Sequence, residues 1–140
     1  MENAARLYGE GVRAFMRLAS SIRDELKLSL CLAKASYCDF MKAYCEALGL
    51  RKSLEDVKAK GGPAGPDEVG RLKMLVRLAE RCLRETVRRL EKLREVIEDE
   101  ALRGEMTELI KMVGEKVEPF LDFRDEVEGL RPDMEEVRKG

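Results

Sequence analysis

Apolar side chains recur every three or four residues along most of the chain, which is the spacing of one face of an α-helix. The first such stripe runs through residues 4–48, with apolar residues eleven apart, a repeat that suits a straight or slightly right-handed helix. We therefore expect one continuous helix over residues 4–48, capped at its end by Gly49. Gly9 and Gly11 are its weakest points, because glycine in a helix interior costs about 1 kcal/mol relative to alanine.

The chain restarts after a loop rich in glycine and proline. Residues 61–66 read GGPAGP, a sequence that opposes both helix and strand. We expect a short helix over residues 53–60 before this loop, because a serine followed by acidic residues resembles a helix start. After the loop, apolar residues follow a strict seven-residue repeat, which predicts a long helix over residues 67–103.

A fourth helical segment is expected after a turn at Gly104. Pro119 should kink or restart this segment, and Gly129 should lie near its end. These elements predict an all-α fold, an elongated antiparallel helical bundle of three main helices plus a short connecting helix. We expect a single domain over residues 1–130, followed by a charged tail over residues 131–140.

Composition supports an all-α fold. Charged residues make up 39% of the chain and aromatic residues only 5%, which suits helices better than sheets. Histidine and glutamine are absent while Lys, Arg and Glu are abundant, so we expect a thermophilic source. The N-terminus has no uninterrupted apolar run, and residues 26–50 contain five charged side chains. We therefore expect a cytoplasmic protein without membrane association.

The absence of histidine removes several classes of catalytic site. Ser-His-Asp triads, Cys-His pairs and the Glu-x-x-His sites of di-iron bundles all require it. The loop at residues 61–66 lacks the Gly-Lys-Ser/Thr ending of a phosphate-binding loop. Carboxylates at residues 98–100 and 122–126 are the type that binds Mg²⁺, but we interpret them as solvated helix faces. We expect no enzyme activity, no cofactor and no bound metal.

Basic side chains form a stripe on the helix predicted over residues 67–103, at spacings of three and four. Such a stripe suits nucleic acid phosphates or an acidic partner. Residues 71–94 hold nine basic and three acidic residues, or +6, whereas residues 95–140 hold seven and fifteen, or -8. Because no aromatic residue is interleaved to stack bases, we favour pairing within the protein over nucleic acid binding. The candidate basic face consists of Lys73, Arg77, Arg81, Arg84, Arg88 and Lys92.

Three of the four cysteines line one edge of the first stripe. Cys31, Cys38 and Cys45 are seven residues apart, so neighbours are separated by about 10 Å along a helix, too far to share an ion or a disulfide. We interpret them as small buried apolar groups. The alternative is a disulfide or close contact between Cys31 and Cys82, because antiparallel helices joined at the loop would place these two at the same level.

The expected helix lengths predict a homodimer. If the helices over residues 4–48 and 67–103 are antiparallel, the fourth segment covers only the end distant from the loop. An apolar patch is then left near the loop with only the short helix over it, and such patches usually mark interfaces. The candidate dimer interface consists of Tyr37, Met41, Tyr44, Leu48, Val69, Leu72 and Val76.

Three functions follow from these expectations. We favour a non-enzymatic helical interaction or assembly module that self-associates and presents charged helix faces to an unidentified protein partner. The second alternative is a nucleic-acid-associated protein that uses the candidate basic face. The third is an Mg-dependent enzyme with carboxylate ligands. Salt-dependent binding of DNA or RNA would separate the second function from the first.

Overall fold

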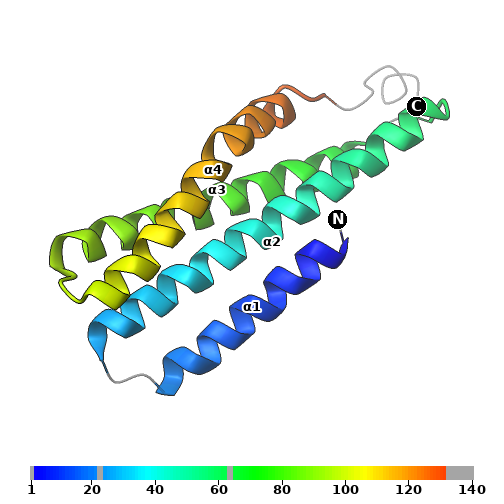
Figure 1. The fold of residues 1–140 in the computed structure, drawn as a ribbon. Coiled ribbons are helices and arrows are strands. Elements are labelled where there is room, and N and C mark those ends of the chain that lie inside the picture. Colours follow the sequence, from blue (N-terminus) through cyan, green and yellow to red (C-terminus); the bar gives the residue numbers. More distant parts are fainter. Residues whose placement is uncertain (1, 22–23, 63–64, 132–140) are drawn as a thin grey trace.

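The computed structural model describes residues 2–21, 24–62 and 65–131 of the chain. Within these residues the chain forms four helices and no strand, so the predicted all-α bundle is confirmed. Figure 1 shows α2 lying between α1 and α3, antiparallel to both, while α4 crosses the α2 and α3 pair. The helices are α1 (Glu2–Ser21), α2 (Glu25–Ala59), α3 (Pro66–Val96) and α4 (Glu100–Glu128).

The single helix expected over residues 4–48 is wrong, because the chain turns back on itself between α1 and α2. The side chain of Asp24 accepts hydrogen bonds from the backbone N–H groups of Leu26 and Lys27, at 2.9 and 3.1 Å. These bonds satisfy donors that a helix start leaves unpaired, so α2 begins here. The bundle consequently has four long helices instead of three.

None of three glycines in α1 and α2 ends a helix. Gly9 and Gly11 lie inside α1, and the predicted cap Gly49 lies inside α2. The short helix expected over residues 53–60 is the last part of α2. A methyl group added at Gly11 would lie 3.0 Å from the sulfur of Cys38, so the missing side chain lets α1 approach α2 closely.

The start of α3 agrees with the sequence prediction, but its end does not. Gly61 has a φ of 86°, in the left-handed region that favours glycine. Pro66 is the first residue of α3. Residues 63 and 64 of the expected loop lie outside the described residues. The predicted end at residue 103 is too late, because the side chain of Asp99 accepts a hydrogen bond from the N–H of Leu102 at 3.0 Å and starts α4.

α4 is one helix from its start to its predicted end. The predicted turn at Gly104 is absent, since this residue lies in the second turn of α4. Pro119 lies inside α4 and does not end it. Gly129 caps the helix, as expected. Of the predicted charged tail, only Arg131 belongs to the described residues.

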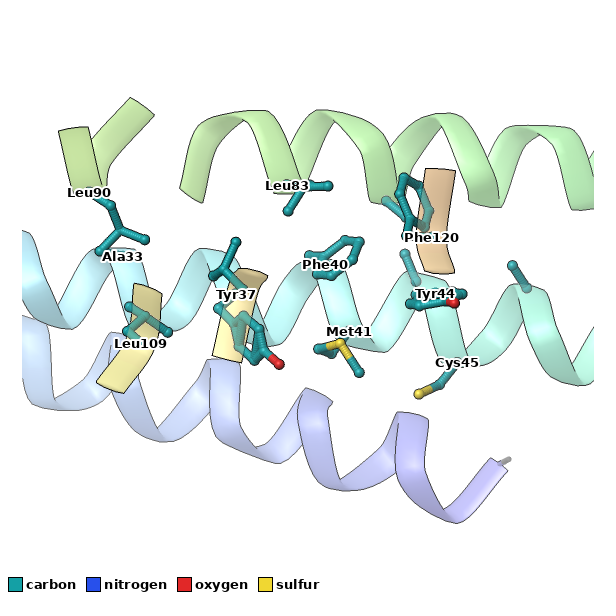
Figure 2. Packing of buried hydrophobic residues seen from close by; sticks show 14 of the residues in the cluster. Ala33, Tyr37, Phe40, Met41, Tyr44, Cys45, Leu83, Leu90, Leu109 and Phe120 are labelled. Atoms are coloured by element: carbon teal, nitrogen blue, oxygen red, sulfur yellow. The ribbon is translucent and has the colours of Figure 1, made fainter. Parts of the chain in front are cut away.

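The seven-residue repeat of α3 forms one side of the core. Its polar member, Thr86, is fully buried and donates a hydrogen bond to the carbonyl of Cys82 at 2.8 Å, which satisfies the hydroxyl. On the other side of the core, the ring of Phe120 from α4 packs edge to face against Phe40 and Tyr44 of α2 (Figure 2). The buried positions of the repeat are Val69, Leu72, Val76, Ala79, Leu83, Thr86, Leu90, Leu93 and Ile97.

The exposed apolar patch predicted near the loop is absent. Figure 2 shows Met41 on the side of α2 that faces α1, which covers it after folding back. Phe120 covers Tyr44, because α4 continues through Pro119. Leu48 is partly buried against the core. Self-association itself stays a prediction, but this surface is not available for it; the buried residues are Tyr37, Met41, Tyr44, Val69, Leu72 and Val76.

Candidate functional site

A cleft of about 880 Å³ lies where α1, α2 and the first turns of α3 meet. Its volume falls within the range of about 300 to 1,000 Å³ that is usual for ligand sites. Glu46 is the only acidic side chain among the described residues that line it. We call it the basic cleft, after its cationic residues Arg6 and Arg13 of α1, Lys42 and Lys52 of α2, and Arg71 of α3.

The cations of the basic cleft are exposed, and none of them forms an ion pair within the described part of the chain. Lys42 attracts the carboxylate of Asp39 but does not contact it. Five positive charges therefore surround a hollow that holds one negative charge. This arrangement attracts anions, and the attraction weakens as salt increases.

The antiparallel packing of α1 on α2 brings these cations together. The hydrocarbon stem of Lys42 crosses α1 at Gly9, where a methyl group would lie 3.5 Å from two of its carbons. Ala5 and Gly9 of α1 and Gly49 of α2 line the cleft with little or no side chain. These three residues therefore take up little of the space between the charged side chains.

Neutral groups of the basic cleft add little chemistry of their own. The hydroxyl of Ser53 donates to the carbonyl of Gly49 at 3.1 Å, so its proton is already used. Among the described lining residues there is no aromatic ring on which a nucleic acid base would stack. Recognition in the cleft therefore depends on charge, and on apolar contact with Leu50 and Leu75.

The candidate basic face lies on a different side of α3. Its central arginines are exposed, as expected, and are more exposed than the buried repeat between them. Lys73 is half-buried and Lys92 is exposed. Arg124 of α4 contacts Glu80 of α3 at 3.0 Å, which places this side of α3 against α4 and away from the basic cleft.

Three arginines of the basic face form ion pairs within the protein. Arg81 forms no ion pair among the described residues, although its charge acts on Cys82. The pairs are Arg77 with Glu128 of α4 at 3.6 Å, Arg84 with Glu80 at 2.8 Å, and Arg88 with Glu85.

All four cysteines are free thiols, so the disulfide between Cys31 and Cys82 is not formed. The thiol of Cys31 donates to the carbonyl of Phe15 at 3.1 Å and so faces α1. Cys82 on α3 lies instead near Asp39. The pKa of the Cys82 thiol is raised mainly by burial and also by the charge of Asp39.

The predicted level of Cys82 was wrong because α2 is longer than expected. It ends at Ala59 and not at residue 48, which moves the loop by eleven residues, or about 16 Å. In the structure Leu83 lies opposite Phe40, and Leu90 lies opposite Ala33 (Figure 2).

The thiols are poor nucleophiles in this structure. Burial, and to a smaller extent the nearby carboxylate of Asp39, raise the pKa of Cys38 to about 11. The pKa values of Cys31 and Cys45 are also raised, mainly by burial. Because the thiolate is the reactive form, these groups stay protonated near neutral pH.

Three carboxylates of the acidic segments at residues 98–100 and 122–126 cap a helix or contact an arginine. Asp99 starts α4, Asp125 contacts Arg124 at 3.1 Å, and a carboxylate oxygen of Glu126 lies 3.7 Å from Arg51. Among the described side chains, no three His, Cys, Asp or Glu residues gather as metal ligands would. Nor does any helix of that region combine the length and apolar character that crossing a membrane requires.

Comparison with known proteins identifies no relative: no protein family matches the chain, and neither a curated protein nor a solved structure matches it.

Proposed function

We propose that the protein is a non-enzymatic helical interaction module that binds a negatively charged protein partner in the basic cleft. The observation that carries this proposal is the set of five cations around the cleft without an ion pair in the described chain. Elsewhere on the bundle, the arginines of α3 and α4 mostly meet acidic groups of the same chain. The cleft gathers five such cations around one hollow.

The shape of the cleft supports a partner that enters it and does not merely touch a flat surface. Three helices supply the charges, so their field converges on the space between them. Each exposed pair contributes only about 0.2 to 1 kcal/mol, so several must act together. Five cations at one site meet that requirement.

The nucleic-acid-associated alternative depends on Arg81 and Lys92, which are exposed on the basic face and form no ion pair among the described residues. We rank it second because their neighbours are already paired within the chain. An Mg-dependent enzyme ranks third, because Asp99 caps α4 while Asp125 and Glu126 contact arginines. A cytoplasmic location and a thermophilic source stay predictions from composition.

Binding of labelled polyglutamate, duplex DNA and single-stranded RNA, measured by fluorescence anisotropy at about 50 and 200 mM salt, tests the proposal. Two double variants change the net charge equally: Arg13→Glu with Lys52→Glu in the cleft, and Arg81→Glu with Lys92→Glu on the basic face. We expect the cleft variant to bind polyglutamate about tenfold more weakly, from about 0.7 kcal/mol per lost contact. The basic-face variant should bind it within about twofold of the wild type.

Each result decides between the functions. Loss of DNA or RNA binding only in the basic-face variant would support the nucleic acid alternative. Polyglutamate binding that is equal in the wild type and the cleft variant, or absent from both, would overturn the proposal. Thermal melting of both variants verifies that the helices remain folded.

A further inference from the structure

A second hollow, of about 330 Å³, is lined by α1, α2 and α4. It shares no lining residue with the basic cleft. Within the described chain, no Cα atom of α1 lies within 8 Å of one in α4, so the two helices flank the hollow without touching. Its volume lies at the lower end of the range that is usual for small-molecule sites. We call it the aromatic hollow, after the rings of Tyr8, Phe15 and Tyr37 in its wall.

The three rings reach the aromatic hollow from two helices. Tyr8 and Phe15 are seven residues apart on α1, so they lie on the same side of that helix, about 10.5 Å from each other along its axis. The ring of Tyr37 lies against Phe40 of the core, with 6.2 Å between centroids, and Figure 2 shows it on the side of α2 that faces α1. Faces of aromatic rings carry negative potential and attract cations.

The charge that remains in the aromatic hollow is negative. Lys34 is the only cation among the described residues that line it, and its ammonium contacts the carboxylate of Glu105 at 2.9 Å, so these two charges offset each other. Glu108 also lines the hollow, is exposed, and forms no ion pair within the described part of the chain. One carboxylate is therefore left beside the three rings.

The tyrosine hydroxyls of the aromatic hollow keep their protons near neutral pH. Burial is the main cause that raises the pKa of Tyr37 to about 12, and the charges of Tyr8 and Glu115 raise it as well. The pKa of Tyr8 is also raised, again mainly by burial. The rings are therefore uncharged, and the negative charge of the hollow is that of its carboxylates.

We propose that the aromatic hollow binds a methylated ammonium group, with the methyl groups against the three rings and the positive charge beside Glu108. Rings with a carboxylate suit such a group, because ring faces attract its charge and its methyl groups need no hydrogen-bond acceptor. A primary ammonium would have three donors to satisfy. This site goes beyond the proposed function, because it lies on another surface and takes a ligand of the opposite charge.

Titration with choline chloride, followed in amide NMR spectra of the isotope-labelled protein, tests the proposal. The neutral analogue dimethylbutanol has a carbon atom in place of the nitrogen, so the two probes differ in charge but hardly in shape. We expect choline to bind in the millimolar range, at least about fivefold more tightly than dimethylbutanol, and to shift resonances of residues around the hollow. Sodium chloride at the same concentrations controls for ionic strength.

Two variants separate the contribution of the charge from that of the rings. Glu108→Gln removes the charge from an exposed side chain and should weaken choline binding about threefold, while dimethylbutanol binding stays within about twofold. Phe15→Leu keeps an apolar side chain without a ring, and should weaken choline binding about threefold more than dimethylbutanol binding. The matched control, Glu91→Gln on α3, removes the same charge away from the hollow and should bind choline like the wild type.

A short peptide with a trimethylated lysine carries the same group on a protein chain. Tighter binding of this peptide than of choline identifies a modified protein as the source of the group, and the reverse order identifies a free small molecule.

The proposal is overturned if choline gives no saturable shift, if choline and dimethylbutanol bind equally, or if either variant of the hollow binds choline like the wild type. It is also overturned if the shifted resonances lie around the basic cleft. Polyglutamate binding in the basic cleft does not depend on any of these results, so the proposed function is tested separately.

Discussion

Replacement of Phe120 by alanine tests whether one aromatic cluster holds α4 on α2. The side chain is 0% exposed, and its ring centroid lies 5.1 Å from those of both Phe40 and Tyr44. Burial of the ring contributes about 2 to 3 kcal/mol, and the two edge-to-face contacts add about 1 to 2 kcal/mol. We therefore expect Phe120→Ala to lower the free energy of unfolding by about 4 kcal/mol. A chain of this length has about 7 to 20 kcal/mol in total.

Urea denaturation followed by circular dichroism measures this loss. The control is Ile110→Ala, which removes a side chain from the same helix where 39% of its surface is exposed. It should cost less than about 1 kcal/mol, because little additional surface leaves water when the chain folds. If Phe120→Ala unfolds within about 1 kcal/mol of the wild type, the cluster does not hold α4 and our account of its attachment is wrong.

Two further predictions concern the replacement of glycines and the ionisation of Cys38. A methyl group added by Gly114→Ala in α4 meets no atom within 4 Å, so this variant should raise Tm by about 3 °C. The variant Gly11→Ala places a carbon 3.0 Å from the sulfur of Cys38 and should not raise Tm. Thermal melting compares the two variants, and equal shifts in Tm would refute a tight contact between α1 and α2. Because burial raises the pKa of Cys38 to about 11 from 9.0, the free energy of unfolding should fall as pH rises from about 9 to 11, where only the unfolded chain loses the proton. Urea titrations across this range should show a smaller fall for Cys38→Ala, and an identical fall would contradict the assignment.

The buried side of α3 was predictable because a single period determines it. Its repeat from Val69 to Leu93 lies within one helix and needs no knowledge of the neighbouring helices. The start of α2 was missed for the opposite reason. The apolar stripe continues at the same spacing on both sides of Asp24, so periodicity alone does not reveal the break.

A local signal for both missed helix starts is present in the sequence. Asp24 precedes Glu25, and Asp99 precedes Glu100, so each helix begins with a capping carboxylate followed by an acidic first turn. The prediction gave more weight to Gly49 and to Gly104. Both glycines lie inside helices, where packing of the neighbouring residues offsets their low helix propensity.

The basic cleft could not be predicted from spacing, whereas the basic face could. In an unbroken helix, Arg13 and Lys42 would be separated by 29 residues, or about 43 Å. The turn before Asp24 brings them to the two sides of one cleft. Arg71 then joins them from a third helix. Such a site becomes visible only when the order of helices in space is known.

The attachment of α1 to α2 alone divides the bundle into regions of unequal local stability. Among the described helices, only α2 has Cα atoms within 8 Å of α1, while α2 and α3 each have neighbours on more than one side. Amide protons of α1 should therefore exchange with solvent through openings that leave α2 to α4 folded. Each opening uncovers the thiols of Cys31 and Cys38, so the rate at which a bulky thiol reagent modifies these cysteines reports how often α1 detaches.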